Sequence, residues 1–225
     1  MHIQIDDDLW KTSIAHSKVD KLLRRGWSEE KALRQAFHDT NEQMLQEMNS
    51  WAPSGSTPSR AGTTACVGLL RKGRLWTANC GDSTCVLGVR VGEGSSWYPA
   101  GIRATSPHSL NAQERARIAR DGGDFWSFSS DTGRFAISCD PDIRSFSIAD
   151  DNIFALCLHS DGIALSPGHI VRTMNLTPSE DKENGSKAKR MNLALELIAQ
   201  NRHYLKSRTS RDNAASIVVL INQSS

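Results

Sequence analysis

Short apolar runs separated by turn-forming residues constrain this chain most, because such runs suit strands. Residues 61–90, "AGTTACVGLLRKGRLWTANCGDSTCVLGVR", contain three of them, near 63–70, 74–80 and 84–91. Between the first two, "RKGR" has the glycine that a hairpin turn favours. This part of the chain therefore predicts a sheet.

Three later segments are also predicted as strands. "NIFALCLHSDG" is nearly all apolar, which is typical of a strand buried on both faces, and we expect it to be central. "ASIVVLI" is rich in β-branched residues and is predicted as a core strand. "GRFAISCDPDIRSFSI" is the third β-type segment.

Segments with the apolar spacing of helices occur before and between these predicted strands. Residues 28–48 predict an amphipathic helix, because Ser28 can cap its start and Glu29 and Glu30 suit its positive end. Its apolar face is Leu33, Phe37, Met44, Leu45 and Met48. "SLNAQERARIARDGG" predicts a short surface helix, and residues 191–205 have helical spacing through Met191, Leu195, Ile198 and Leu205. Together these elements predict an α+β layered domain.

Length, charge and cysteine content indicate an ordinary globular domain. The chain has 225 residues, enough for one sizeable core, so we expect a single domain, and its net charge of +2 gives no argument for a nucleic-acid or membrane partner. No apolar run approaches the ~20 residues of a membrane-spanning helix. The five cysteines form no CxxC pair, which fits a reducing intracellular compartment, cytoplasm or nucleus, without disulfides or zinc. We expect a monomer.

Three aspartates lie next to the predicted strands. Asp82 follows "RLWTANCG", Asp161 follows "IFALCLHS", and Asp212 precedes "ASIVVLI". Carboxylates gathered at the ends of strands suit a hard cation such as Mg²⁺ or Mn²⁺. Each aspartate taken alone also suits an ordinary turn, because Gly-Asp, Asp-Gly and Asp-Asn all favour turns.

The residues around these aspartates resemble a known family. "GTTA", "ANCGDS", "SDG" and "DNAASIVV" occur in the order of the motifs of the metal-dependent protein phosphatases, the type 2C serine/threonine phosphatases. "SPHSLNAQERARIARDGG" and "GDFWSFSSDTGRFAISCDPDI" are similar to the family's intervening segments. The subgroup it most resembles is the stress-induced, p53-linked phosphatases, which share Leu-Gly after the GDS strand, Trp-Ser after Gly-Asp and a basic stretch before DN.

The resemblance implies a fold, a metal site and a substrate class. The fold is a four-layer α-β-β-α sandwich of two antiparallel sheets flanked by helices. Asp161 and Asp212 match ligands of the family's two Mg²⁺ or Mn²⁺ ions, and Asp82 matches an additional, weaker metal site. Metal-activated water then attacks the phosphorus of phosphoserine or phosphothreonine proteins. A His159–Ser160–Asp161 triad is not expected, because neighbours along a strand point to opposite faces.

The chain also departs from the family pattern at its N-terminus. The family's Asp-Gly-His-Gly-Gly stretch, whose first Asp bridges both metal ions, occurs nowhere in the sequence, and the family's arginine-bearing strand is missing after Gly123. Residues 1–27 form a divergent start and residues 28–225 are family-like, so we expect a single phosphatase-like domain, 1–225, without the N-terminal strands. In one alignment Asp6 replaces the bridging Asp; in the other the motif is lost.

Two functional hypotheses follow from this pattern. The first is a metal-dependent serine/threonine phosphatase, weak or inactive as written, including the case of a shortened form of a longer protein. The second is a catalytically dead phosphatase-like module that binds or regulates. Repulsion between two divalent ions must be offset by anionic ligands, so two or three aspartates favour one weakly held ion over a tight pair.

Overall fold

A computed structural model describes most, but not all, of the chain. The described residues are 2–5, 14–51, 63–92, 96–108, 112, 116, 128–129, 134–135, 139–175, 192–205 and 214–221, and their side chains are described from Ser17 on, except at 45, 48–51, 128–129 and 134–135. The predicted helix between residues 109 and 123 falls almost entirely outside this part; only Ala112 and Ala116 are described there, and both are helical.

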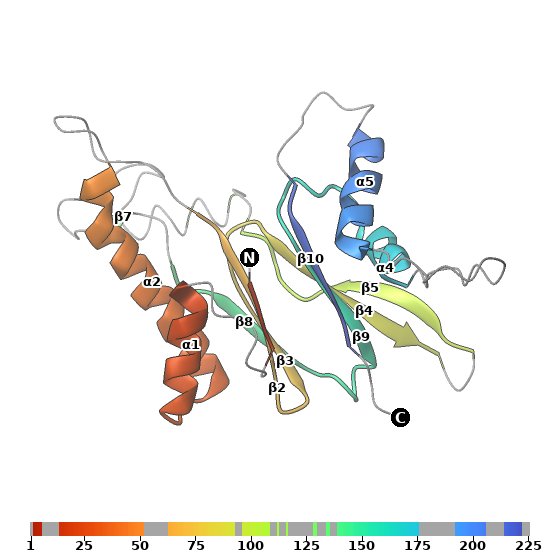
Figure 1. The fold of residues 1–225 in the computed structure, drawn as a ribbon, viewed down its shortest axis with the longest axis horizontal. Coiled ribbons are helices and arrows are strands. Elements are labelled where there is room, and N and C mark those ends of the chain that lie inside the picture. Colours follow the sequence, from red (N-terminus) through yellow and green to blue (C-terminus); the bar gives the residue numbers. More distant parts are fainter. Residues whose placement is uncertain are drawn as a thin grey trace, which may run out of the picture.

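Two four-stranded sheets form the middle of the molecule and pack against each other as two layers (Figure 1). Sheet A contains β1 (His2–Ile5), β2 (Ala65–Arg71), β3 (Arg74–Cys80) and β8 (Asp142–Ser147), in the order β1-β2-β3-β8. Sheet B contains β4 (Thr84–Val91), β5 (Tyr98–Arg103), β9 (Ile153–His159) and β10 (Ser216–Leu220), in the order β10-β9-β4-β5. A separate two-residue ladder joins β6 (Phe128–Ser129) to β7 (Arg134–Phe135).

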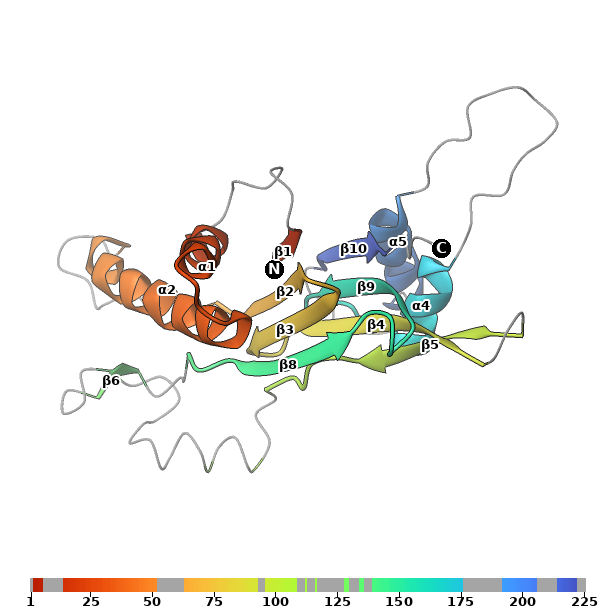
Figure 2. The same ribbon diagram turned by 90° about the horizontal axis from the view of Figure 1, so that it is seen from below.

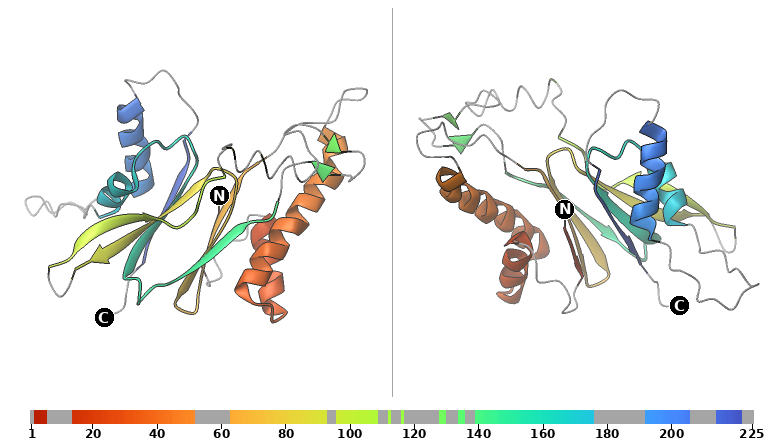
Figure 3. Two further views of the ribbon diagram at one scale, coloured as in Figure 1. Left: turned by 180° about the vertical axis from the view of Figure 1, so that it is seen from behind. Right: turned by 45° about the horizontal axis from the view of Figure 1, so that its top comes forward.

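Helices lie on the outer side of each sheet, which gives the predicted four layers (Figure 2). On the side of sheet A are α1 (Ile14–Arg24) and α2 (Glu29–Trp51). On the side of sheet B are α4 (Pro167–Met174) and α5 (Leu193–Leu205), and the two further views keep the same grouping (Figure 3). The α+β sandwich predicted from sequence is therefore confirmed. No helix in the described ranges is both long and apolar enough to span a bilayer.

Alternation along β9 builds the core on both faces of sheet B. Leu156 and Leu158 join a buried cluster with Leu75 of sheet A, whereas Cys157 packs with Ile170 of α4. All seven residues of β9 are buried, so the prediction of a central strand is confirmed. A third cluster packs Leu33 and Phe37 of α2 and Val19 of α1 against sheet A.

Two sequence-based expectations are wrong in detail. The "ASIVVLI" run forms β10, which is an edge strand of sheet B rather than an interior one, and Leu220 is 54% exposed. The predicted apolar face of α5 is correct at Ile198, which packs against the core, but wrong at Leu195, which is 63% exposed, while Leu197 and Asn201 are buried. Leucines lie on several sides of this helix, so apolar spacing alone does not select the buried face.

The N-terminal segment contains a strand where none was expected. Strand β1 runs parallel to β2, with His2 opposite Val67 and Ile5 opposite Leu70. The other strand pairs of the two sheets are antiparallel.

Candidate metal centre

Asp82 lies where the chain crosses from one sheet to the other. β3 of sheet A ends at Cys80, and β4 of sheet B begins at Thr84. Gly81 makes this crossing with φ of +114°, and a Cβ placed there would overlap the side chain of Thr64. Only glycine satisfies both conditions, because L side chains avoid this φ and the space behind it is filled. The Asp82 side chain that follows is exposed.

Hydrogen bonds hold the peptide of Gly81 from two directions. The Gly81 carbonyl oxygen accepts from the backbone N–H of His108 at 2.9 Å and from Asn79 Nδ2 at 2.9 Å. In return, the Gly81 N–H donates to His108 Nδ1 at 3.4 Å. One residue beyond Asp82, Ser83 Oγ lies 3.0 Å from Thr64 Oγ1. The backbone on both sides of Asp82 is thus fixed while its carboxylate faces solvent.

Asn79 is the buried member of this arrangement. Its side chain is fully buried, and Nδ2 also donates to the Ser106 carbonyl oxygen at 3.3 Å. Within the described residues, Asn79 Oδ1 is a buried polar atom that has no hydrogen-bond partner. The two Nδ2 hydrogen bonds, to the carbonyl oxygens of Gly81 and Ser106, give Asn79 a positioning role at this turn.

Asp161 leaves sheet B at the same end as Asp82. Strands β4 and β9 are antiparallel, and Thr84 lies opposite His159. Asp82 is two residues before Thr84, and Asp161 is two residues after His159, so both aspartates lie beyond the same end of this strand pair. Asp161 is exposed.

The chain just before β10 reaches the same place. The Ser160 N–H donates to the Ala215 carbonyl oxygen at 3.0 Å, and the Ala215 N–H donates to Ser160 Oγ at 3.1 Å. Asp212 itself lies outside the described residues.

The side-chain oxygens at this end of sheet B are of the chemical type that binds a hard cation. Asp82 and Asp161 supply carboxylate oxygens, the ligands that Mg²⁺ and Mn²⁺ prefer. The part of the chain that the structure describes contains no group of three His, Cys, Asp or Glu side chains arranged to hold a metal ion. Two described carboxylates therefore match the charge of one divalent ion rather than two.

Comparison with known proteins decides the family. The protein phosphatase 2C family profile matches residues 4–206, which is most of the chain. The chain belongs to the protein phosphatase 2C family. It is 31% identical over 121 residues to protein phosphatase 2C 1 of Paramecium tetraurelia, covering 47% of this chain and 36% of that protein. It is 33% identical over 128 residues to probable protein phosphatase 2C 21 of rice, covering 47% and 35% respectively.

Solved structures support the fold. The serine-threonine phosphatase 2C of Toxoplasma gondii superimposes with a TM-score of 0.62 at 18% identity, covering 92% of this chain and 75% of that one. This chain spans about a third of the length of the curated protein phosphatase 2C relatives given above.

The strand directions in this protein phosphatase 2C chain give no support to Asp6 as a bridging ligand. Asp6 lies outside the described residues, but β1 ends at Ile5, opposite Leu70. β2 begins at Ala65, opposite Cys80, so Leu70 lies toward the other end of sheet A from the Asp82 turn. The last described residue before Asp6 is therefore directed away from the candidate site.

His159 and Ser160, which precede Asp161, both make hydrogen bonds to the backbone. His159 Nδ1 donates to the Ser160 carbonyl oxygen at 2.8 Å, and Ser160 Oγ accepts from Ala215. Burial lowers the pKa of the His159 imidazole, the Ser160 carbonyl opposes that shift, and the nearby Arg103 adds to it. His159 is thus a buried, neutral residue beneath the site.

The sequence pointed to the aspartates as candidate ligands but not to the residues that hold the Asp82 turn. Asn79 and Thr64 stand inside the quoted "ANCGDS" and "GTTA" motifs, so their signal was present. His108 lies 27 residues from Gly81, and its hydrogen bonds depend on a contact that spacing does not reveal.

Proposed function

We propose that this chain is a protein phosphatase 2C-type domain that binds one Mg²⁺ or Mn²⁺ ion at the Asp82–Asp161 end of sheet B. As a hydrolase of phosphoserine and phosphothreonine proteins it is weak. The observation that carries the proposal is the pairing of Thr84 with His159, which directs two exposed aspartates beyond one end of the same strand pair.

The protein's own residues have distinct parts in this proposal. Asp82 and Asp161, together with Asp212, would hold the ion, which when bound supplies an activated water for phosphoester hydrolysis. Asn79 and His108 hold the Gly81 peptide, so Asp82 needs little reordering when a cation binds. This preorganisation supports binding despite the small number of ligands.

Charge accounts for the low activity that we propose. Two divalent ions bring four positive charges together, and these 225 residues contain no Asp-Gly-His-Gly-Gly motif whose carboxylate would bridge them. The family's arginine-bearing strand is also missing from the sequence, which leaves the substrate phosphate without a bidentate clamp. A site with one weakly held ion aligns water and substrate poorly.

The finer placement near the stress-induced, p53-linked subgroup belongs to the same proposal. It is supported by Leu87 and Gly88 in β4, by Trp126 and Ser127 after Asp124, and by the basic "KSRTSR" before Asp212. The alternative function, a catalytically dead module that binds phosphoproteins, is favoured by the absent Asp-Gly-His-Gly-Gly stretch.

Turnover and binding measured on one phosphopeptide separate the two functions. We expect slow phosphate release from a phosphothreonine peptide in manganese, and a fall to background in Asp161→Asn. Peptide binding with no release above background in the unmodified chain would favour the binding module. Turnover comparable to an intact family member would contradict the weak site proposed here.

A further inference from the structure

A second group of reactive side chains lies outside the candidate metal centre, where α2 meets the chain entering β8. Cys139 Sγ is 3.2 Å from His38 Nδ1, and His38 Nε2 is 3.5 Å from Asp140 Oδ1. The imidazole therefore lies between a thiol and a carboxylate. His38 comes from α2, whereas Cys139 and Asp140 directly precede β8, and Figure 2 shows α2 beside the start of that strand.

This order of groups is that of an activated nucleophile. A thiol becomes nucleophilic when a neighbouring base takes its proton, and a third group that orients the base keeps it in place. Asp140 orients the His38 ring through Nε2, which leaves Nδ1 toward the thiol. Arg34 in turn holds Asp140 by an ion pair and lies 3.6 Å from Glu30, so the carboxylate is itself fixed.

Solvent reaches the group. The side chain of His38 is 44% exposed and that of Asp140 is 53% exposed, while Cys139 is half-buried. The buried thiols differ in this respect: burial raises the pKa of Cys66 and of Cys157 to about 12, and raises the pKa of Cys85 well above its usual value. Those three thiols stay protonated and inaccessible, so Cys139 stands apart from them.

We propose that Cys139 is a site of reversible oxidation by a small hydroperoxide, with His38 as its proton acceptor and Asp140 as the residue that positions His38. His38 takes the thiol proton, and the sulfur attacks one peroxide oxygen. The S–O bond forms as the O–O bond breaks. The sulfur loses two electrons, the peroxide gains them, and the departing hydroxide takes the proton from the His38 ring and leaves as water. The product is a sulfenic acid. One small thiol condenses with it to a mixed disulfide and water, and a second thiol then releases the free cysteine by exchange.

The thiol also lies at the same end of sheet A as the Asp82 turn. β8 begins at Asp142, opposite Asn79, which holds the turn that carries Asp82. Cys139 precedes β8 at that end of sheet A. An oxidised Cys139 would therefore sit at the end of sheet A from which the Asp82 turn leaves.

Trapping of the sulfenic acid tests the proposal. The full chain is treated with limiting hydrogen peroxide in the presence of dimedone, and labelling of each cysteine peptide is followed by mass spectrometry. We expect Cys139 to be labelled well before Cys80, the other half-buried thiol. His38→Gln should slow labelling of Cys139 at least about tenfold, and Asp140→Asn should slow it less.

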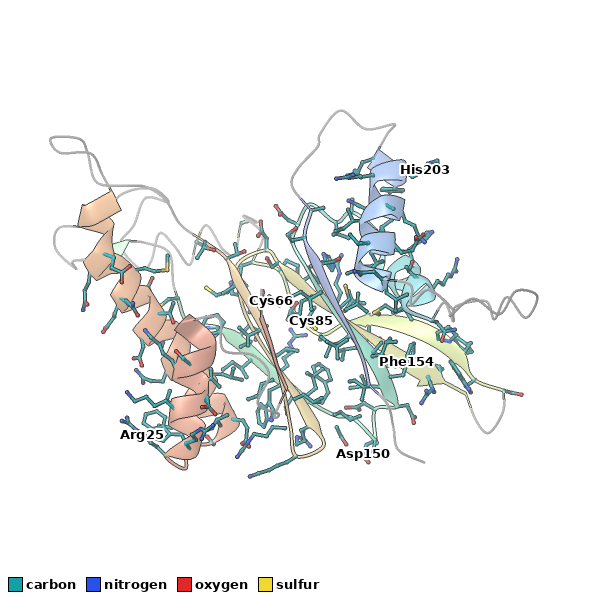
Figure 4. All side chains as sticks on the ribbon, viewed as in Figure 1. Arg25, Cys66, Cys85, Asp150, Phe154 and His203 are labelled. Carbon is teal, nitrogen blue, oxygen red and sulfur yellow. The ribbon has the colours of Figure 1, made fainter. Side chains whose placement is uncertain are left out.

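A matched histidine variant controls for general effects. His203 is exposed on α5, which lies across the molecule from α2 (Figure 4), so His203→Gln should leave Cys139 labelling unchanged. Because both histidines are partly exposed, both variants should fold. Thermal unfolding of each variant checks this. Equal labelling of Cys139 and Cys80, or labelling of Cys139 that His38→Gln does not slow, would overturn the proposal.

Discussion

At the scale of single residues, the Asp82 turn shows which part of the site is local. Gly81, Asp82 and Ser83 are adjacent in sequence, so a turn with an exposed carboxylate was predictable from them. The bonds that fix the turn come from Thr64 and His108, which are distant in sequence. The same distinction applies to Cys139 and His38, which are 101 residues apart and meet only in the folded chain.

Glu29 makes a single-residue contact whose strength depends on pH. Its carboxylate lies 2.5 Å from Arg71 Nη1 and 4.0 Å from Lys72 Nζ, at the start of α2. A hydrogen bond from its own backbone N–H lowers the pKa of the Glu29 carboxyl, burial opposes this shift, and Arg71 and Lys72 lower the pKa further. The folded chain therefore holds this proton less tightly than the unfolded chain, and the contact stabilises above the unfolded pKa of ~4.3.

We expect Glu29→Gln to lower the free energy of unfolding at pH 7 by about 1–2 kcal/mol, because it removes a charge-assisted hydrogen bond from a mostly buried pair. The difference should shrink as the pH falls below ~4.3 toward the lowered pKa of Glu29, and should be smaller at pH 3 than at pH 7. Urea denaturation at both pH values measures it. Glu30→Gln is the matched control, since Glu30 is 57% exposed, and should change little. A loss that persists unchanged at pH 3 would contradict the electrostatic origin.

At the scale of elements, the strands were predictable and some of their neighbours were not. Apolar runs with turn residues between them located β2, β3, β4 and β9, because burial on both faces leaves a direct mark on the sequence. The edge position of β10 has no such mark, since a β-branched run suits an edge as well as a centre. Part of the buried face of α5 was missed because Asn201 is buried there, where it donates to Gly162 and accepts from Ala164.

Helix α4 contacts sheet B at Gly101 of β5. A Cβ on Gly101 of β5 would overlap the carbonyl of Pro167, the first residue of α4. Gly68 of β2 is also a strand glycine, buried where Gly101 is half-buried, but a Cβ there would meet only Leu75 Cδ1 at 3.8 Å and Leu156 Cδ1 at 3.9 Å, which are ordinary contacts. The two glycines therefore form a matched pair.

We expect Gly101→Ala to destabilise the chain by about 1–3 kcal/mol, because the backbone of α4 must move away from the sheet. Gly68→Ala should be neutral or stabilise by up to about 1 kcal/mol, because alanine restricts the unfolded chain. Chemical denaturation of the two variants in parallel measures both effects. Equal losses at the two positions would show that the contact between β5 and α4 is not what Gly101 serves.

At the scale of the whole molecule, the sandwich brings together ends of segments that are far apart in sequence. The turn between β3 and β4, the end of β9 and the chain before β10 meet at one end of sheet B. The order of motifs predicted this family arrangement, because each motif marks the end of a strand. Which carboxylates can act together depends on the directions of the strands that carry them.

The metal ion is the central claim, and the shift in melting temperature with manganese tests it most directly. We expect manganese to raise the melting temperature of the chain, because an ion that binds only the folded state stabilises it. The rise should disappear when Asp161 and Asp212 are both changed to Asn. It should be smaller in Asp82→Asn. Without metal, the stability of Asp82→Asn should hardly change, because Asn suits the same turn. Asp150→Asn is the control: Asp150 is exposed in the turn before β9, at the other end of that strand (Figure 4), and the variant should keep the full rise. A rise that survives the double substitution, or no rise in the unmodified chain, would contradict the account.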